Sequence, residues 1–354
     1  AIIGGFMVAT ALMSMWISNT ASTLIMIPIA LSVVAEACDE SPEGGAYKFE
    51  VALLLAVAFS ASVGGLGTLV GSPPNLLLAG FLKQEFGIDL SFVDWLRFGL
   101  PVVIVLLPVI WISLTRFSFP ISDREINLRA ARRQIEDNYE KLGPLTTAER
   151  RVALVFGAVA LCWVIRPLLL QLPGLGHLSD TAIALTGAIV LFLVPSGQGD
   201  YLMDWSTAKT LPWNVVLLYG GGMALAGAMS SSGLTDWLVA RVIHTEDWSL
   251  FAVLLSVTAV TLFLTELTNN SAALATLLPV LAGVAVANDY PLLILMVPAT
   301  LAASCAFMLP VATPPNAIVY GTGKISISQM ASAGLVLNVL GLGTISILCF
   351  ALLT

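Results

Sequence analysis

Two short polar clusters stand inside hydrophobic stretches of this sequence. "SMWISNTA" covers Ser14–Ala21 and "TELTNNSA" covers Thr265–Ala272, 251 residues later, and each starts with a hydroxyl residue and contains adjoining asparagine and hydroxyl residues. Hydroxyl and amide oxygens are ligands that small hard cations prefer. Hydrolysis would need a nucleophile with a base, or a metal cluster, and neither histidine lies near a cluster. The residue types therefore favour ion binding over catalysis.

A second pair of motifs follows the first in the same order. "GSPPN" at Gly71–Asn75 recurs as "ATPPN" at Ala312–Asn316, 241 residues later. The prolines lack amide donors, so a helix interrupted there frees carbonyl oxygens for a cation such as sodium. Amide groups at the start of the following helix suit the oxygens of an anion. Two motifs in the same order predict a tandem duplication, with a cation site and half of an anion site in each copy.

The surrounding elements must be membrane helices. Of the 354 residues 58% are hydrophobic and 10% are charged, which leaves too little polar surface for water. The sequence therefore predicts an all-α polytopic membrane protein in the cell membrane. The apolar runs that approach the length of a bilayer span lie at about 51–62, 95–118, 152–172, 180–195, 211–232, 249–267, 271–287, 290–309 and 331–353.

Each polar cluster is expected at the tip of a re-entrant hairpin. The apolar arms around Ser18-Asn19-Thr20 run about 13 to 15 residues, or roughly 20 Å, which is too short to span. Irregular backbone at membrane depth requires protein or a water-filled cavity to satisfy its polar groups. The proline motifs are expected to interrupt two further transmembrane helices.

The distribution of charge predicts the orientation. Eight of the 15 basic residues fall in the loop 116–151, which marks it as cytoplasmic: Arg116, Arg124, Arg129, Arg132, Arg133, Lys141, Arg150 and Arg151. Six acidic residues among them disfavour a nucleic-acid partner. Counting crossings from this loop, the first hairpin enters from the cytoplasm, the second, at 249–287, enters from outside, and the C-terminus lies outside. Opposite topologies are the inverted-repeat plan of secondary transporters.

These expectations divide the chain into consecutive parts. The second copy has three more apolar runs before its motif than the first, so something over a hundred N-terminal scaffold residues are expected to be missing. The parts are first-repeat transport elements at 1–94, a transmembrane helix with a cytoplasmic amphipathic linker at 95–151, second-repeat scaffold helices at 152–248, second-repeat transport elements at 249–328 and a C-terminal transmembrane helix at 329–354.

Structural readings compete with these functional ones. Single Ser, Thr and Asn residues in membrane helices often only hydrogen-bond to neighbouring helices, and a double proline can be a simple kink. Recurrence of both motifs weakens those readings. Glu266 is the second residue of the second cluster, where the first copy has Met15. An intramembrane carboxylate could relay protons or hold an ion, or it could be a hydrogen-bonded structural group.

Together the motifs resemble the divalent anion/sodium symporter family of INDY-like dicarboxylate transporters, which are of the ion-transporter-superfamily type. The signature of that family is a Ser-Asn-Thr motif at each of two opposed hairpin tips. The first is intact as Ser18-Asn19-Thr20, and the second departs from it as Asn269-Asn270-Ser271. The likeness covers essentially the whole chain, including the order of apolar runs, the basic amphipathic stretch and the Pro-Pro-Asn breaks.

The resemblance implies ligands for both ions and substrate. It implies two or more sodium ions, held by Ser14, Asn19 and main-chain oxygens around Gly67 in one site and by Thr265, Asn270 and main-chain oxygens near Ala312 in the other. It implies a dicarboxylate held by Ser18, Asn19, Thr20, Thr68, Asn269, Asn270, Ser271, Thr313 and Pro314. It also implies a homodimer whose transport domain moves like an elevator against a scaffold domain.

The expected function is sodium-coupled symport of C4-dicarboxylates such as succinate, malate and fumarate. Neither motif contains arginine or lysine, so the affinity for a dianion should depend on bound sodium. The alternative is a sodium-independent exchanger or a proton-coupled permease for dicarboxylate, citrate or sulfate, with Glu266 as the titrating group. The variant Glu266→Gln would separate the two, since only proton-driven uptake should need the carboxylate. Two opposed hairpins favour alternating access over a channel.

Overall fold

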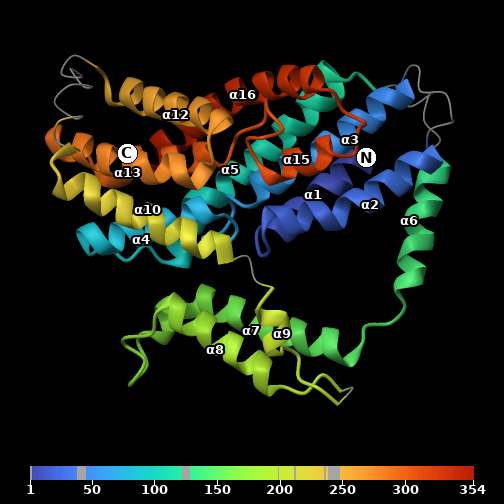
Figure 1. Ribbon diagram of the computed structural model, residues 1–354, viewed down its shortest axis with the longest axis horizontal. Coiled ribbons are helices and arrows are strands. Elements are labelled where there is room, and N and C mark those ends of the chain that lie inside the picture. The colour runs from blue at the N-terminus through green and yellow to red at the C-terminus, as the bar shows by residue number, and fades with distance from the viewer. Residues whose placement is uncertain are drawn as a thin grey trace.

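The expected all-α membrane fold is confirmed. A computed structural model describes residues 2–37, 45–121, 128–197, 199–210, 213–234, 237 and 248–354, and its regular elements over these residues are helices (Figure 1). Arg124 of the basic loop lies outside the described residues. Within the described residues, seven helices are long and apolar enough to cross a bilayer, at Asn19–Ala37, Tyr47–Gly64, Phe92–Ser118, Thr147–Leu169, Leu250–Leu267, Asn270–Ala287 and Ile327–Leu353. The protein is therefore an integral membrane protein.

Two sets of five helices share one order. The first set is α1 (Ile2–Ser14), α2 (Asn19–Ala37), α3 (Gly45–Gly64), α4 (Pro73–Phe86) and α5 (Phe92–Ile112). The second set is α12 (Leu250–Leu267), α13 (Asn270–Ala287), α14 (Leu292–Ala303), α15 (Pro314–Tyr320) and α16 (Ile327–Leu353). In each set the polar cluster joins the first two helices, and the double proline starts the fourth.

Between the sets lie the elements of the linker and of the middle region. They are the π-helical turn η1 (Ser113–Ser118), α6 (Leu128–Leu142), α7 (Thr147–Leu169), α8 (Asp180–Leu193), α9 (Trp205–Ala208) and α10 (Trp213–Ser231). In Figure 1, α7, α8 and α9 form a layer below the other helices, and α6 descends toward them along the right-hand side.

Helix ends follow from local sequence in both sets. The double prolines occupy the first helical positions of α4 and α15, where a missing amide hydrogen costs least, and Ser72 and Thr313 precede them as N-caps. Helices α5 and α16 both begin with a capping box, Ser91 with Asp94 and Ser326 with Gln329.

Contacts between the two sets come in matched pairs. Helix α2 packs on α15, and its counterpart α13 packs on α4. Helix α15 also packs on α3, as α4 packs on α14. Within the sets, α1 packs on α3 as α12 packs on α14, and α3 packs on α5 as α14 packs on α16. The duplication predicted from the motifs therefore extends to how the helices pack.

In the first hairpin, for which arms of 13 to 15 residues are expected, one arm agrees and the other is longer. Helix α1 has 13 residues, but α2 has 19, because backbone hydrogen bonding continues beyond the apolar residues, as at Glu36. In the second hairpin α12 and α13 have 18 residues each. Eighteen residues extend about 27 Å, close to the thickness of the hydrocarbon core of about 30 Å. Length alone does not make these hairpins re-entrant, so re-entry stays a prediction.

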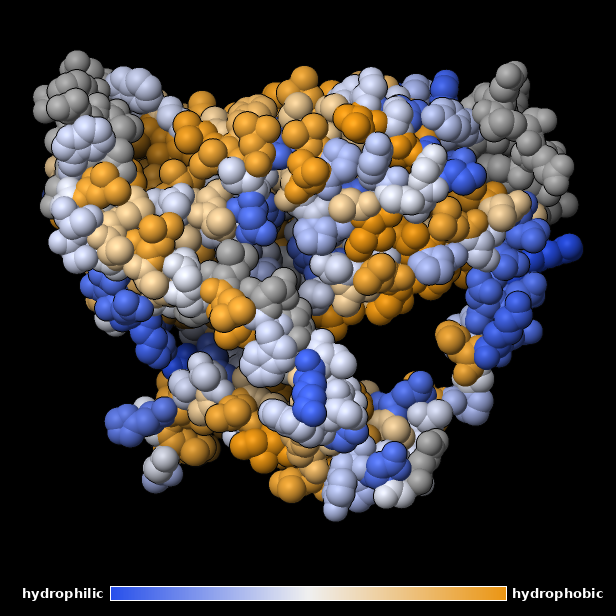
Figure 2. Space-filling model, in the orientation of Figure 1, coloured by the Kyte–Doolittle hydropathy of each residue, from blue (hydrophilic) through white to orange (hydrophobic). Residues whose placement is uncertain are grey.

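The surface is apolar over large areas. Hydrophobic residues cover much of the face in Figure 2, whereas hydrophilic residues follow α6 at the right. Exposed hydrophobic side chains on α7 and α16 include Leu154 at 67% and Ile347 at 61%. Patches of this kind mark contact with lipid or with another protein chain.

Candidate functional site

The two helix breaks adjoin in the interior. The break between α3 and α4 covers residues 65–72, and the break between α14 and α15 covers residues 304–313. The buried hydroxyls of Ser72 and Ser304 are 3.1 Å apart, and the rings of Phe59 and Phe307 pack with their centroids 5.0 Å apart. Motifs far apart in the sequence are thus brought together.

The tip of the first hairpin is joined to the first break. The hydroxyl of Thr68 donates to the carbonyl of Met15 and accepts from the amide of Gly71 at 3.1 Å. Gly67 lies against the same methionine, and a Cβ at this position would come within 2.7 Å of Met15 Cε. The hydroxyl of Thr68, predicted to bind substrate, therefore holds the tip in place, and Gly67 lies beside that tip.

Oxygen atoms converge around the side-chain amide of Asn19. One of the two terminal atoms of this amide, its oxygen or its nitrogen, lies 2.7 Å from Ser14 Oγ, 3.2 Å from the carbonyl oxygen of Ala61 and 3.3 Å from that of Gly71. An amide nitrogen there has all three oxygens within hydrogen-bond distance for its two hydrogens. An amide oxygen there completes a cluster of four oxygens, which a cation would stabilise. The predicted pair Ser14 and Asn19 is thus brought together, with carbonyls that sequence reasoning did not single out.

The predicted residues of the second cation site are placed less closely. Thr265 is buried, and its hydroxyl donates to Leu262 O at 2.9 Å within α12. The Oδ1 atom of Asn270 is buried without a donor among the described residues. Ala312 is buried in the second break. A buried amide oxygen without a donor is costly unless another ligand satisfies it, so Asn270 fits a cation ligand.

Ser18 and Asn269 occupy equivalent positions. Each side chain accepts a hydrogen bond from the backbone at the start of the helix that follows. Ser18 Oγ accepts from Ala21 N at 3.2 Å at the start of α2. Asn269 Oδ1 accepts from Ser271 N at 3.0 Å and from Ala272 N at 3.3 Å at the start of α13. Serine and asparagine are both favoured N-caps. The departure from the Ser-Asn-Thr signature at Asn269 therefore preserves the helix start.

The remaining predicted substrate residues lie at the tips and at the second break. Thr20 is half-buried in the first turn of α2, and Ser271 is buried in the first turn of α13. Thr313 is buried, and its hydroxyl accepts from Asn316 N at 3.3 Å. Pro314 is exposed at the first position of α15.

Glu266 is a fully engaged hydrogen-bond acceptor. Its carboxylate accepts from the amides of Phe307, Met308 and Leu309 at 2.7–3.2 Å and from Asn338 Nδ2 at 2.7 Å. The carboxylate thereby anchors the second break to α12 and α16. This geometry favours the structural reading of Glu266. It also makes Glu266→Gln a poor test of proton coupling, because an amide nitrogen facing these donors would disturb the break whatever the coupling ion.

Sequence reasoning missed the role of the asparagine that ends each double-proline motif. Asn75 Nδ2 donates to the carbonyls of Gly65 and Thr68 at 2.9 and 2.8 Å, and Asn316 Nδ2 donates to those of Ala306 and Leu309 at 3.1 Å each. Both side chains are buried. The sequence contains a signal for this role, because the asparagine recurs in both copies of the motif. The prolines of the motif do not account for that recurrence.

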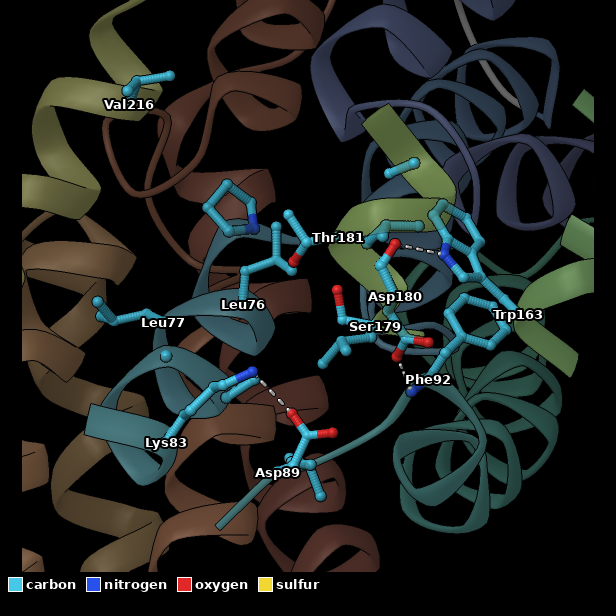
Figure 3. A pocket seen from close by; sticks show the side chains of 18 of the residues that line it. Leu76, Leu77, Lys83, Asp89, Phe92, Trp163, Ser179, Asp180, Thr181 and Val216 are labelled. Carbon is cyan, nitrogen blue, oxygen red and sulfur yellow. Dashed lines mark hydrogen bonds and ion pairs between the residues drawn. The ribbon is translucent and has the colours of Figure 1, made fainter. Parts of the chain in front are cut away.

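Both hairpin tips open on one cavity of about 650 Å³. Ser18 from the first tip, Ser271 from the second and Pro73 from the start of α4 all line it. In Figure 3, Leu76, Leu77 and Lys83 of α4 face Trp163, Ser179 and Asp180 across this space. The N-termini of α2, α4 and α13 therefore border a common space, which the starts of α5 and α8 also line at Phe92 and Asp180. Helix N-termini attract anions.

A charged cluster ties α7 and α8 to the loop between α4 and α5. Arg166 is buried, and its Nη2 lies 2.8 Å from Asp89 Oδ2, while its Nη1 lies 3.5 Å from Asp180 Oδ1. Lys83 Nζ lies 3.2 Å from the other oxygen of Asp89. Hydrogen bonding from Arg166 lowers the pKa of Asp89, which is therefore ionised at neutral pH.

Comparison with known proteins places these features in a family. Residues 2–352 match the family described as "Sodium:sulfate symporter transmembrane region". The chain is 42% identical over 357 residues to the sodium-dependent dicarboxylate transporter SdcS of Staphylococcus saprophyticus, covering 98% of this chain and 68% of the relative. It is 40% identical over 344 residues to the protein of the same name in Staphylococcus aureus strain USA300, covering 95% of this chain and 66% of the relative. The chain thus spans about two thirds of the length of these relatives.

Proposed function

The chain belongs to the sodium:sulfate symporter transmembrane family, and on that premise we propose that it is a sodium-coupled symporter of C4-dicarboxylates such as succinate, malate and fumarate. The resemblance inferred from the Ser-Asn-Thr and Pro-Pro-Asn motifs is confirmed by this match. The family and the similar proteins are transporters rather than enzymes. The names of those relatives supply the class of substrate.

One observation carries the proposal: both polar tips, 251 residues apart in sequence, border the same cavity. The cavity is bordered by the starts of α2, α4 and α13, at Ser18, Pro73 and Ser271. The partial positive charges of these helix starts would attract the two carboxylates of the substrate. Ser18, Asn19, Thr20 and Thr68 would contact it on one side, and Asn269, Asn270, Ser271, Thr313 and Pro314 on the other.

Two or more sodium ions would bind beside the substrate. With the amide oxygen of Asn19 turned toward them, the oxygens of Ser14, Ala61 and Gly71 would form the first site, with Gly67 adjoining. The Oδ1 atom of Asn270, which has no donor among the described residues, supports the second, together with Thr265 and Ala312. Because the motifs contain no lysine or arginine, these ions would supply the positive charge that a dianion needs. Each ligand would then strengthen the binding of the other.

The transport cycle would use the duplicated architecture. The basic loop 116–151 would face the cytoplasm, the C-terminus would lie outside, and the two repeats would have inverted topology with re-entrant hairpins. Matched packing of α2 on α15 and of α13 on α4 supports this arrangement. The elements of 1–94 and 249–328 would move as a transport domain against scaffold helices at 152–248. Residues 95–151 and 329–354 would supply the remaining transmembrane helices and the cytoplasmic linker. Two copies of the chain would form a homodimer.

Uptake into proteoliposomes tests the proposal. Labelled succinate, citrate and sulfate would each be offered with and without an inward sodium gradient. Sodium-dependent accumulation of succinate supports the proposed function. Equal uptake in sodium and choline would contradict sodium coupling and indicate an exchanger or a proton-coupled permease. Uptake of sulfate but not of succinate would contradict the proposed substrate.

A further inference from the structure

The cavity carries a charged group at the end of α4 away from the hairpin tips. Lys83 and Asp89 line it at the C-terminal end of α4 and in the following loop, and Asp180 lines it at the start of α8 (Figure 3). Arg166 lies behind the two aspartates and contacts both. Formally, two cationic and two anionic side chains balance.

Among these four charged side chains, Lys83 is the one that can leave its ion pair with Asp89 and bind another anion. Asp89 is already held by the buried Arg166 at 2.8 Å, whereas Lys83 is 62% exposed and lies 3.2 Å from the second oxygen of Asp89. An exposed ion pair of this kind contributes little to stability. Lys83 can therefore exchange a carboxylate of the protein for another anion at small cost.

One face of α4 leads from Lys83 to the hairpin tips. Pro73, Leu77, Gly80 and Lys83 all line the cavity and recur at helical spacing. Ten residues separate Pro73 from Lys83, so the lysine lies about 15 Å along the helix from the start of α4. The lining between these two ends includes the apolar side chains of Leu76 and Leu77. This face of α4 would attract a small dianion only weakly, except at the two ends of the helix.

We propose that Lys83 is an entry residue that attracts dianionic substrates into the cavity and favours them over less charged molecules. The inference rests on the proposed function, because it concerns the path to the same site. Its basis is charge balance. With Lys83 in place the lining group is formally neutral, and without it Arg166 alone faces Asp89 and Asp180, leaving a net negative charge that repels a dianion. The cavity is larger than a C4-dicarboxylate requires, which suits a vestibule.

A series of variants changes the charge of this group in single steps. Lys83→Gln makes it more negative, Asp89→Asn makes it more positive, and the double variant and Lys83→Arg both retain the original balance. The side-chain amide introduced by Asp89→Asn would still offer an oxygen to Arg166. Lys324→Gln is the matched control, because Lys324 is 53% exposed, pairs with Glu50 at 3.1 Å and does not line the cavity.

The measurement is the KM and maximal rate of sodium-driven succinate uptake by the protein in proteoliposomes at low ionic strength. Lys83→Gln should raise KM about threefold with little change in maximal rate, and Asp89→Asn should lower KM. Lys83→Arg and the double variant should stay near wild type. Added choline chloride should remove the differences, because the screening length falls to about 10 Å at 0.1 M salt.

The outcomes separate the two levels of inference. If the wild type takes up no dicarboxylate, the proposed function is wrong. If the wild type transports succinate but KM does not follow charge at positions 83 and 89, the entry role of Lys83 is wrong while the function stands. A shift of equal size in Lys324→Gln would also overturn it, because general surface charge would then be the cause.

Discussion

Asn75 makes two hydrogen bonds across the first helix break, and Asn316, 241 residues later, makes the equivalent two across the second. Each side-chain nitrogen reaches back to the carbonyls of the residues seven and ten positions before it. Each asparagine therefore closes a loop across a helix break. The double proline removes backbone donors at this place, and the asparagine supplies a replacement from its side chain.

Replacing either asparagine by aspartate should disable transport. Aspartate has nearly the same shape as asparagine, but in Asn75→Asp or Asn316→Asp a carboxylate oxygen would face two buried carbonyl oxygens. Leaving such groups unsatisfied costs about 1–3 kcal/mol each. We expect at least a tenfold loss of sodium-driven succinate uptake and a lower melting temperature.

The matched control for these variants is Asn288→Asp. Asn288 donates to Val284 O at the end of α13, away from both breaks, and its replacement should have a smaller effect. Uptake at the wild-type rate by both Asn75→Asp and Asn316→Asp would contradict the role given to the asparagines.

Two glycines on neighbouring helices are expected to set the position of the breaks. A Cβ at Gly99 of α5 would overlap the carbonyl oxygen of Leu66, and a Cβ at Gly334 of α16 would overlap that of Phe307. Gly99→Ala and Gly334→Ala should therefore each displace one break and reduce uptake several-fold. Gly341→Ala, on α16 with no heavy atom of the described residues within 4 Å of the added Cβ, should retain uptake. A loss as large in Gly341→Ala would show that α16 tolerates no added methyl group.

Glu266→Gln should lower stability and sodium-driven uptake together. The carboxylate accepts from Asn338 and from three consecutive backbone amides, and hydrogen bonds to charged groups are worth about 1.5–3 kcal/mol each. A glutamine in its place would turn two donor hydrogens toward donors. The measurements are melting temperature and uptake at several external pH values. Intact stability combined with a lost pH dependence of uptake would contradict the structural role and identify Glu266 as a proton carrier.

Ser14→Ala should weaken the first cation site. Ser14 Oγ lies 2.7 Å from the amide position of Asn19 and donates to Ala61 O at 2.6 Å. Removing this oxygen should raise the half-saturating sodium concentration about tenfold, or about 1.4 kcal/mol. Ser256→Ala is a suitable control, since that hydroxyl bonds only to Ala252 O among the described contacts of α12. An unchanged sodium dependence in Ser14→Ala would place the cation elsewhere.

The sequence predicted the helices, the polar tips and the breaks because each has a local cause in hydrophobic length, hydrogen-bonding residues or proline. It did not predict that the oxygens of Ala61 and Gly71 lie beside Asn19, because a backbone carbonyl carries no signature in the side chains. Nor did it predict that Glu266 anchors the second break, since its donors lie 41–72 residues away along the chain. The length of α2 is underestimated because helical hydrogen bonding does not stop where apolar residues end.

Bound sodium is expected to supply the positive charge that the substrate site lacks. The most direct test is the dissociation constant of succinate for the purified protein, measured by calorimetry in sodium chloride and in choline chloride at equal ionic strength. Succinate should bind at least tenfold more tightly in sodium, and it should raise the affinity for sodium by the same factor. Equal dissociation constants in the two salts would contradict this role of sodium.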